Sequence, residues 1–160
     1  MPTPPPLDAA GAVVPHDHDE IEAGDRVIRR ISDRQIVTDG AGARRISSLA
    51  YQASGGANGG MSVDIEKFIV EGGDEPEQWV TTPRWIGSVC FSAGFLRGLQ
   101  FQIGYHPIEE TSERPANPYH GEVWGTFSRA QKIALQQNAN WFVPIPDVEL
   151  DQPLADQATG

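Results

Sequence analysis

The stretch WIGSVCFSAGFLRGLQFQIGYHP, residues 85–107, decides the fold class of this chain. Its first part is a short apolar run typical of a buried strand, and Ser92 then stands where the N-cap of a short helix is expected. Further on, Leu99, Phe101 and Ile103 alternate with polar residues, which predicts a second strand. Short strands and helices that follow one another without a regular strand–helix–strand repeat indicate an α+β domain.

The same pattern continues on both sides of this stretch. We expect further strands at 25–31, 44–51, 61–65, 118–125 and 141–145, and helices at 64–73, 76–80 and 128–140. In the glycine-rich segment 54–60, Asn58 and Gly59 both tolerate a positive φ, so a hairpin turn is predicted there. Together these elements predict a small mixed or antiparallel sheet with about three short helices.

The two ends of the chain carry its whole charge imbalance. Ten acids and no base lie in residues 1–25 and 146–160, which accounts for the formal net charge of −10. We therefore expect one α+β domain at 25–146, a flexible proline-rich acidic tail at 1–24, and a flexible acidic tail at 147–160. The low pI then reflects the tails and not an acidic binding face.

The composition predicts a soluble cytoplasmic protein. No apolar run approaches the roughly 20 residues needed to span a bilayer, and the N-terminus lacks the basic and apolar regions of a secretory signal. The single cysteine, Cys90, lies in an apolar stretch, so we expect a buried and unreactive thiol. We expect no membrane partner and no cofactor, and the acidic tails argue against binding to nucleic acid.

Charge is also segregated within the middle of the chain. Six arginines between Arg26 and Arg45 accompany two acids, whereas six acids in 64–77 accompany only Lys67. Pairing between the two stretches is one interpretation, because surface ion pairs are common. The other is an arginine-lined anion site, since the guanidinium fork fits phosphate and carboxylate groups.

Polar residues of the predicted strands form a candidate ligand-binding site. Arg30, Ser48 and Ser62 fall in neighbouring predicted strands. If their side chains converge, they make an oxygen-rich, arginine-bearing pocket for an anionic ligand.

Three further residues are candidates for catalysis. His106 and His120 lie in or beside predicted strands, each near a carboxylate, and Glu122 is that carboxylate for His120. An imidazole titrates near neutral pH and can serve as acid, base or ligand, although a purely structural role for both histidines stays open. His16 and His18 lie in the expected tail, where only adventitious metal binding is expected, so no metal site is predicted.

Four segments carry a resemblance that spans most of the domain: RVIRRI (26–31), RISSLAY (45–51), MSVD (61–64) and NPYHGEVWG (117–125). They resemble a set of small bacterial proteins of unknown function that share an arginine strand, an R-x-S-S-x-A-aromatic segment, an M/L-S-V segment and N-P-x-H-x-x-V-x-G. Ile46 stands where that pattern has proline, and Tyr51 where it has phenylalanine. The resemblance implies a shared fold and assigns no activity.

A looser resemblance concerns the Arg-Ser-Glu arrangement of ADP-ribosyltransferases. An arginine strand, a serine strand and a late glutamate such as Glu122 are present. Two features depart from it, since no helix is predicted between the first two strands and no Glu-x-Glu occurs.

Two functions remain open at this stage, and whether the protein is an enzyme is undecided. The first is a non-catalytic interaction or accessory module of a bacterial multi-gene system, because Trp79, Trp85, Tyr119 and Trp124 are residue types that anchor protein partners. The alternative is a small enzyme or anionic-ligand binder that handles a nucleotide through the Arg/Ser/His pocket. The sequence does not indicate the oligomeric state.

Overall fold

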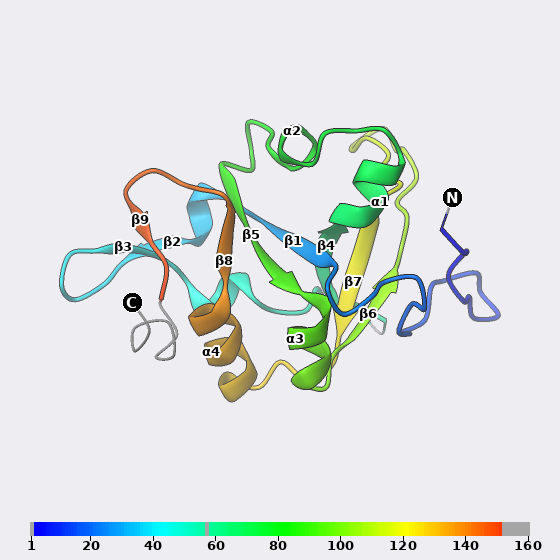
Figure 1. Ribbon diagram of the computed structural model, residues 1–160, viewed down its shortest axis with the longest axis horizontal. Coiled ribbons are helices and arrows are strands. Elements are labelled where there is room, and N and C mark those ends of the chain that lie inside the picture. Colours follow the sequence, from blue (N-terminus) through cyan, green and yellow to red (C-terminus); the bar gives the residue numbers. More distant parts are fainter. Residues whose placement is uncertain (1, 57, 152–160) are drawn as a thin grey trace.

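The computed structural model describes residues 2–56 and 58–151 as an α+β fold with two sheets (Figure 1). The main sheet is antiparallel, with strand order β6-β7-β4-β1-β5-β8, and the small sheet has the order β2-β3-β9. The main strands are β1 (Arg26–Ile31), β4 (Met61–Ile65), β5 (Gly87–Ser92), β6 (Gln102–Tyr105), β7 (His120–Trp124) and β8 (Asn140–Val143). The small sheet contains β2 (Ile36–Thr38), β3 (Arg44–Ile46) and β9 (Val148–Glu149).

Four α-helices and two 3-10 turns connect the strands. They are α1 (Glu66–Glu71), α2 (Pro76–Val80), α3 (Ala93–Gly98), α4 (Arg129–Asn138), η1 (Asp33–Gln35) and η2 (Ser48–Ala50). The cap predicted at Ser92 is confirmed, because its hydroxyl accepts a hydrogen bond from the Phe95 amide at 3.1 Å. Ser128 caps α4 in the same way by accepting from the Gln131 amide at 3.2 Å. Within the described residues, no helix is long and apolar enough to cross a membrane.

The apolar core lies on one face of the main sheet. Val27 and Ile31 of β1 point to this face, and Ile65 of β4 and Phe91 of β5 stand directly beside Val27. All four side chains are at most 2% exposed. Because successive side chains of a strand point to opposite faces, this register places Ile28 and Arg30 of β1 on the other side.

Helices pack onto the apolar face through aromatic contacts. The ring of Phe68 in α1 meets Tyr105 edge-on at 5.3 Å between centroids, and Phe95 of α3 lies nearly parallel to Phe91 at 6.1 Å. Such pairs add to the burial of apolar surface that holds each helix on the sheet.

The opposite face of the main sheet, here called the polar face, holds most of the candidate site residues. Across β6, β7, β4 and β1 its residues are Gly104, His106, His120, Glu122, Ser62, Asp64, Ile28 and Arg30. The alternation in the sequence therefore fixes which residues share this face.

The expected strand at 44–51 is too long, and the expected hairpin at 54–60 is wrong. The strand ends at Ile46 because the Ser47 hydroxyl caps a 3-10 turn by accepting from the Leu49 amide at 3.2 Å. β3 joins the small sheet, whereas β4 pairs with β1 and β7. In this segment Gly60 lets the backbone pass close to β7, since a β-carbon there would lie 2.7 Å from the Val123 carbonyl oxygen.

The domain begins earlier than residue 25. Ile21 is 1% exposed and belongs to the core, and His18 is 5% exposed. The His18 amide donates to the Ile103 carbonyl at 2.9 Å, and the Ile103 amide donates to Asp17 at 3.0 Å, so this segment covers the outer edge of β6 (Figure 1). The expectation that all of 1–24 lies outside the core is therefore wrong.

The domain also ends later than residue 146. β9 pairs in parallel with β3, and Val148 is 7% exposed. Arg45 binds Asp151 at 3.0 Å and Glu149 at 3.4 Å, which ties this segment to the small sheet. Residues 152–160 of the expected tail lie outside the described residues.

Candidate functional site

Five of the six predicted site residues lie on the polar face. They are Arg30 on β1, Ser62 on β4, His120 and Glu122 on β7, and His106 directly after β6. Ser62 stands directly opposite Glu122, and the His106 amide donates to the His120 carbonyl at 2.9 Å. Ser48 is the exception, because it lies in η2, which packs against α4.

A buried carboxylate fixes Arg30 on this face. The Arg30 Nε and Nη2 atoms donate to the two oxygens of Asp64 at 2.8 and 3.0 Å, and Asp64 is only 3% exposed. The Asn117 amide donates to the same carboxylate at 2.8 Å and accepts from the Trp79 indole at 3.2 Å. The Arg30 Nη1 has no partner among the described residues, so one edge of the fork remains available.

A second buried carboxylate fixes His106. Its Nδ1 lies 3.0 Å from Glu122 Oε2, and the side chains are 35% and 7% exposed, respectively. Because a carboxylate accepts, Nδ1 carries the proton in the neutral ring, which leaves the lone pair on Nε2. Neither His106 Nε2 nor Glu122 Oε1 has a partner within the part of the chain that the structure describes.

His120 is held as a neutral imidazole between these two pairs. Its Nδ1 donates to the His106 carbonyl at 2.7 Å, and its ring lies 5.5 Å from that of His106. Burial lowers the pKa of His120, against the opposing effects of its hydrogen bond and of Asp64 and Glu122. The neutral ring therefore keeps its lone pair on Nε2.

The N-terminal segment supplies a wall of the site that the sequence did not indicate. His16 lies 5.2 Å from the ring of Trp124, and both rings fill the space above Gly104. The His16 Nδ1 donates to the Val14 carbonyl at 2.8 Å, and its Nε2 accepts from the Tyr105 amide at 3.1 Å. Since both ring nitrogens are used, His16 is a structural residue here.

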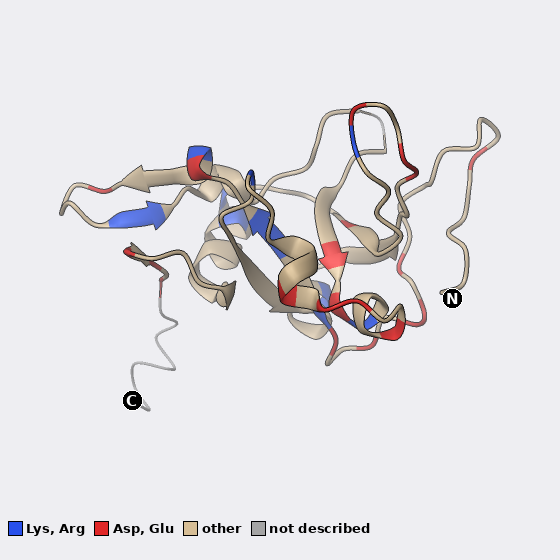
Figure 2. Ribbon diagram, turned by 90° about the horizontal axis from the view of Figure 1, so that it is seen from above, with Lys and Arg blue, Asp and Glu red and all other residues tan. Residues whose placement is uncertain are grey.

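Ion pairs join the arginine-rich and acidic stretches. Arg30 pairs with Asp64, and Arg26 pairs with Glu66 at 2.5 Å. Acids of both terminal segments also contact basic residues of the domain, including Asp17 with Arg97 at 3.0 Å and Asp151 with Arg45 at 3.0 Å. Figure 2 shows the acidic positions of the ribbon in red and the basic positions in blue. No group of three or more metal-ligating side chains occurs within residues 2–56 and 58–151.

The aromatic residues expected as interface anchors are largely buried. Trp124 is 5% and Tyr119 is 9% exposed, and Trp79 and Trp85 are partly buried. The Trp124 indole donates to the Asn58 carbonyl at 2.8 Å, and Trp79 meets Tyr119 edge-on at 4.9 Å. These residues therefore contribute mainly to packing.

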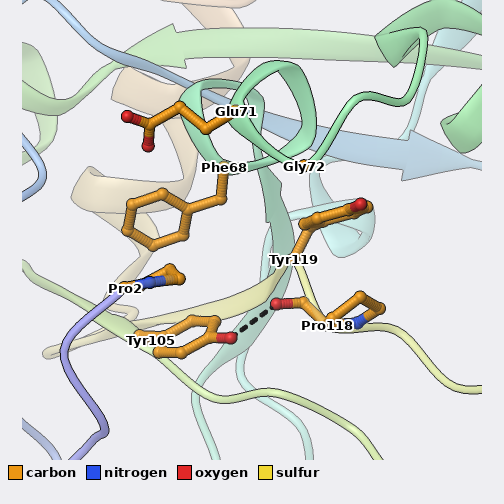
Figure 3. Close-up of a pocket in the computed structure, with 7 residues that line it drawn as sticks. All are labelled: Pro2, Phe68, Glu71, Gly72, Tyr105, Pro118 and Tyr119. Atoms are coloured by element: carbon orange, nitrogen blue, oxygen red, sulfur yellow. Dashed lines mark hydrogen bonds between the residues drawn. The ribbon is translucent and has the colours of Figure 1, made fainter.

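A separate aromatic hollow of about 80 Å³ lies beside α1 (Figure 3). Its lining residues are Pro2, Phe68, Glu71, Gly72, Tyr105, Pro118 and Tyr119. The Tyr105 hydroxyl donates to the Pro118 carbonyl at 2.7 Å, and the Tyr119 hydroxyl donates to Asp74 at 2.6 Å. Both hydroxyls are thus turned to protein partners, which leaves ring surface around the hollow.

Two residues of the site on the polar face, Asp64 and Asn117, were not predicted from the sequence. Asp64 follows Ser62 at the spacing of one strand face, and this alternation was the signal that could have identified it. Asn117 lies outside the main strands, and only its contact with Asp64 places it at the site.

No family model, curated protein or solved structure matches the chain.

Proposed function

We propose that the protein is a small nucleotide-handling enzyme of the ADP-ribosyltransferase type, which cleaves the nicotinamide–ribose bond of NAD⁺ at the polar face. The observation that carries this proposal is the placement of Arg30, Ser62 and Glu122. They lie on one face of the adjacent strands β1, β4 and β7, with Ser62 directly opposite Glu122. An Arg-Ser-Glu site requires its three side chains to lie on the same face in this way.

The serine of this set is Ser62 and not Ser48. With Ser62 as the serine, the two strands to compare are β1 and β4, and the segment between them contains the helical turns η1 and η2. The absence of a predicted helix between the strands expected at 25–31 and 44–51 therefore does not bear on this set. The chain still lacks a Glu-x-Glu. His120 occupies the position two residues before Glu122, where a Glu-x-Glu would place its first acid.

The buried carboxylates of the polar face suit a positively charged transition state. When the C1′–N bond breaks, both electrons leave with neutral nicotinamide, and positive charge develops on the ribose ring. Two carboxylates, Asp64 and Glu122, are buried at this face, and their side chains are at most 7% exposed. A fixed carboxylate in a poorly solvated site stabilises developing positive charge strongly, and Glu122 Oε1 is the oxygen without a described partner.

The His106–Glu122 pair provides a base for the incoming nucleophile. Water or an acceptor hydroxyl forms the new bond to C1′, and its proton passes to the free Nε2 of His106. Glu122 orients the imidazole through Nδ1 at 3.0 Å. This is the geometry of a carboxylate-oriented general base.

We expect Arg30 to orient the phosphate end of the ligand. Its guanidinium reaches Asp64 on β4, two strand spacings or about 10 Å from β6, the strand directly before His106. Because Asp64 already pairs with Arg30, we expect the remaining Nη1 to orient a phosphate and to contribute little to affinity.

The test measures by chromatography the nicotinamide that the full chain releases from NAD⁺. We expect release by the wild type and a loss of roughly 10²-fold in Glu122→Gln. The matched control is Glu113→Gln, an exposed acid in the loop before β7. Absence of release by the wild type, or equal release by a folded Glu122→Gln protein, would rule out the proposal.

A further inference from the structure

The aromatic hollow beside α1 is lined in part by Pro2, close to the N-terminus. Pro2 lines the hollow together with Phe68 and Tyr105, and in Figure 3 it appears between these two rings, with Tyr119 on the other side. Proline rings pack well on aromatic surfaces, and aromatic-lined grooves are a recurring means of binding extended proline-rich peptides. Pro2, which lines this hollow, begins such a sequence, PTPPPL at residues 2–7.

The residue after Pro2 is fixed by hydrogen bonds to Glu20 and His18. The Thr3 amide donates to Glu20 Oε2 at 2.7 Å, and the Thr3 carbonyl accepts from His18 Nε2 at 2.8 Å. This pair of bonds is here called the clamp, and the Thr3 side chain also hydrogen-bonds to Glu20. The clamp therefore requires a residue with a free backbone N–H and C=O.

The clamp is built on the same core as the hollow. His18 is 5% exposed, and its ring meets Phe68 and Tyr105 edge-on at 5.8 and 5.9 Å. Its Nδ1 accepts from the Glu20 amide at 3.2 Å, which fixes the ring with Nε2–H toward Thr3. One rigid unit thus presents an aromatic surface for a proline and a backbone clamp for the next residue.

We propose that the hollow and the clamp form a binding site for a proline-containing extended segment of a partner protein, and that Pro2, which lines the hollow, and Thr3, which the clamp holds, cover part of this site in cis. The partner presents proline followed by a residue with a free backbone amide. It displaces Pro2 and Thr3, so the chain's own N-terminus lowers the apparent affinity. This role is separate from the polar face and does not depend on NAD⁺ chemistry.

The test uses a labelled peptide with the sequence of residues 2–7, PTPPPL, and full-length protein variants. We expect weak binding to the wild type and binding at least about tenfold tighter to Pro2→Gly, because the cis competitor is weakened. Pro4→Gly is the matched control, since Pro4 is exposed and does not line the hollow. It should bind the peptide as the wild type does.

Two further arms locate the site. Pro2→Gly combined with Tyr119→Leu should lose the gain, with folding checked by circular dichroism. A peptide whose first proline is alanine should bind Pro2→Gly at least about tenfold more weakly, and this arm leaves the protein unchanged. Equal binding by wild type and Pro2→Gly, or equal binding of the two peptides, would overturn the proposal.

Discussion

Arg30 and Asp64 form a two-point ion pair across β1 and β4, with Nε–Oδ2 and Nη2–Oδ1 distances of 2.8 and 3.0 Å. Asp64 is 3% exposed and also accepts from Asn117. The pair therefore connects the centre of the main sheet to the loop that precedes β7.

Removal of Arg30 should destabilise the fold strongly. Arg30→Gln leaves the Asp64 carboxylate buried without its cation, and we expect a loss of about 3–5 kcal/mol in the free energy of unfolding. Urea denaturation measures it. The control is Arg26→Gln at the more exposed pair with Glu66, where a loss of about 1 kcal/mol or less is expected. Equal losses in the two variants would contradict the role of burial.

Acid should destabilise the protein through His120. Burial lowers the pKa of this imidazole in the folded state, so the unfolded chain binds the proton first, near the ordinary value of about 6.5. The stabilising contribution is present above that pH and is lost as pH falls through the lowered folded pKa. His120→Asn keeps an N–H near Nδ1 and removes the titration. Its free energy of unfolding should fall less steeply below about pH 6.5, whereas parallel curves would refute the prediction.

The tyrosines should resist ionisation in the folded protein. The hydrogen bond to Asp74 raises the pKa of Tyr119 to about 12, and burial raises the pKa of Tyr51 and of Tyr105. Alkaline titration followed by tyrosinate absorbance should show little ionisation near the ordinary value of about 10, and full ionisation there in urea. Because the folded pKa values are raised, the associated stability is present below that pH and is lost as pH rises through them.

Asp74→Asn provides the control for this titration. Without the carboxylate acceptor, the pKa of Tyr119 should fall toward about 10, and one of the three tyrosines should ionise earlier. An unchanged titration curve would show that the hydrogen bond is not the cause.

A methyl group at position 104 should loosen the N-terminal segment. A β-carbon on Gly104 would lie 2.5 Å from Trp124 Cζ3 and 2.6 Å from His16 Cε1. We expect Gly104→Ala to lower the melting temperature and to speed hydrogen exchange over residues 16–21. Gly98→Ala, where nothing lies within 4 Å, should do neither. Equal exchange in both variants would contradict the contact.

The sequence predicted the local elements because each depends on nearby residues. Ser92 and Ser128 cap helices through amides three residues away, and the alternation in 26–31 and 61–65 sets which side chains share a face. Arg30 and Ser62 became candidates because they fall in neighbouring predicted strands. Ser48 was placed wrongly because the bond from the Leu49 amide to Ser47 favours a tight turn over a strand.

By itself, the sequence determined the α+β class, the caps and the faces of the strands, because these follow from propensity and from a period of two. Only the tertiary structure decided that β4 lies between β1 and β7, that His18 and Ile21 belong to the domain, and that Asp64 holds Arg30. Strand order and long-range ion pairs join residues distant in sequence. They depend on which partners exclude water together, and no local pattern records that choice.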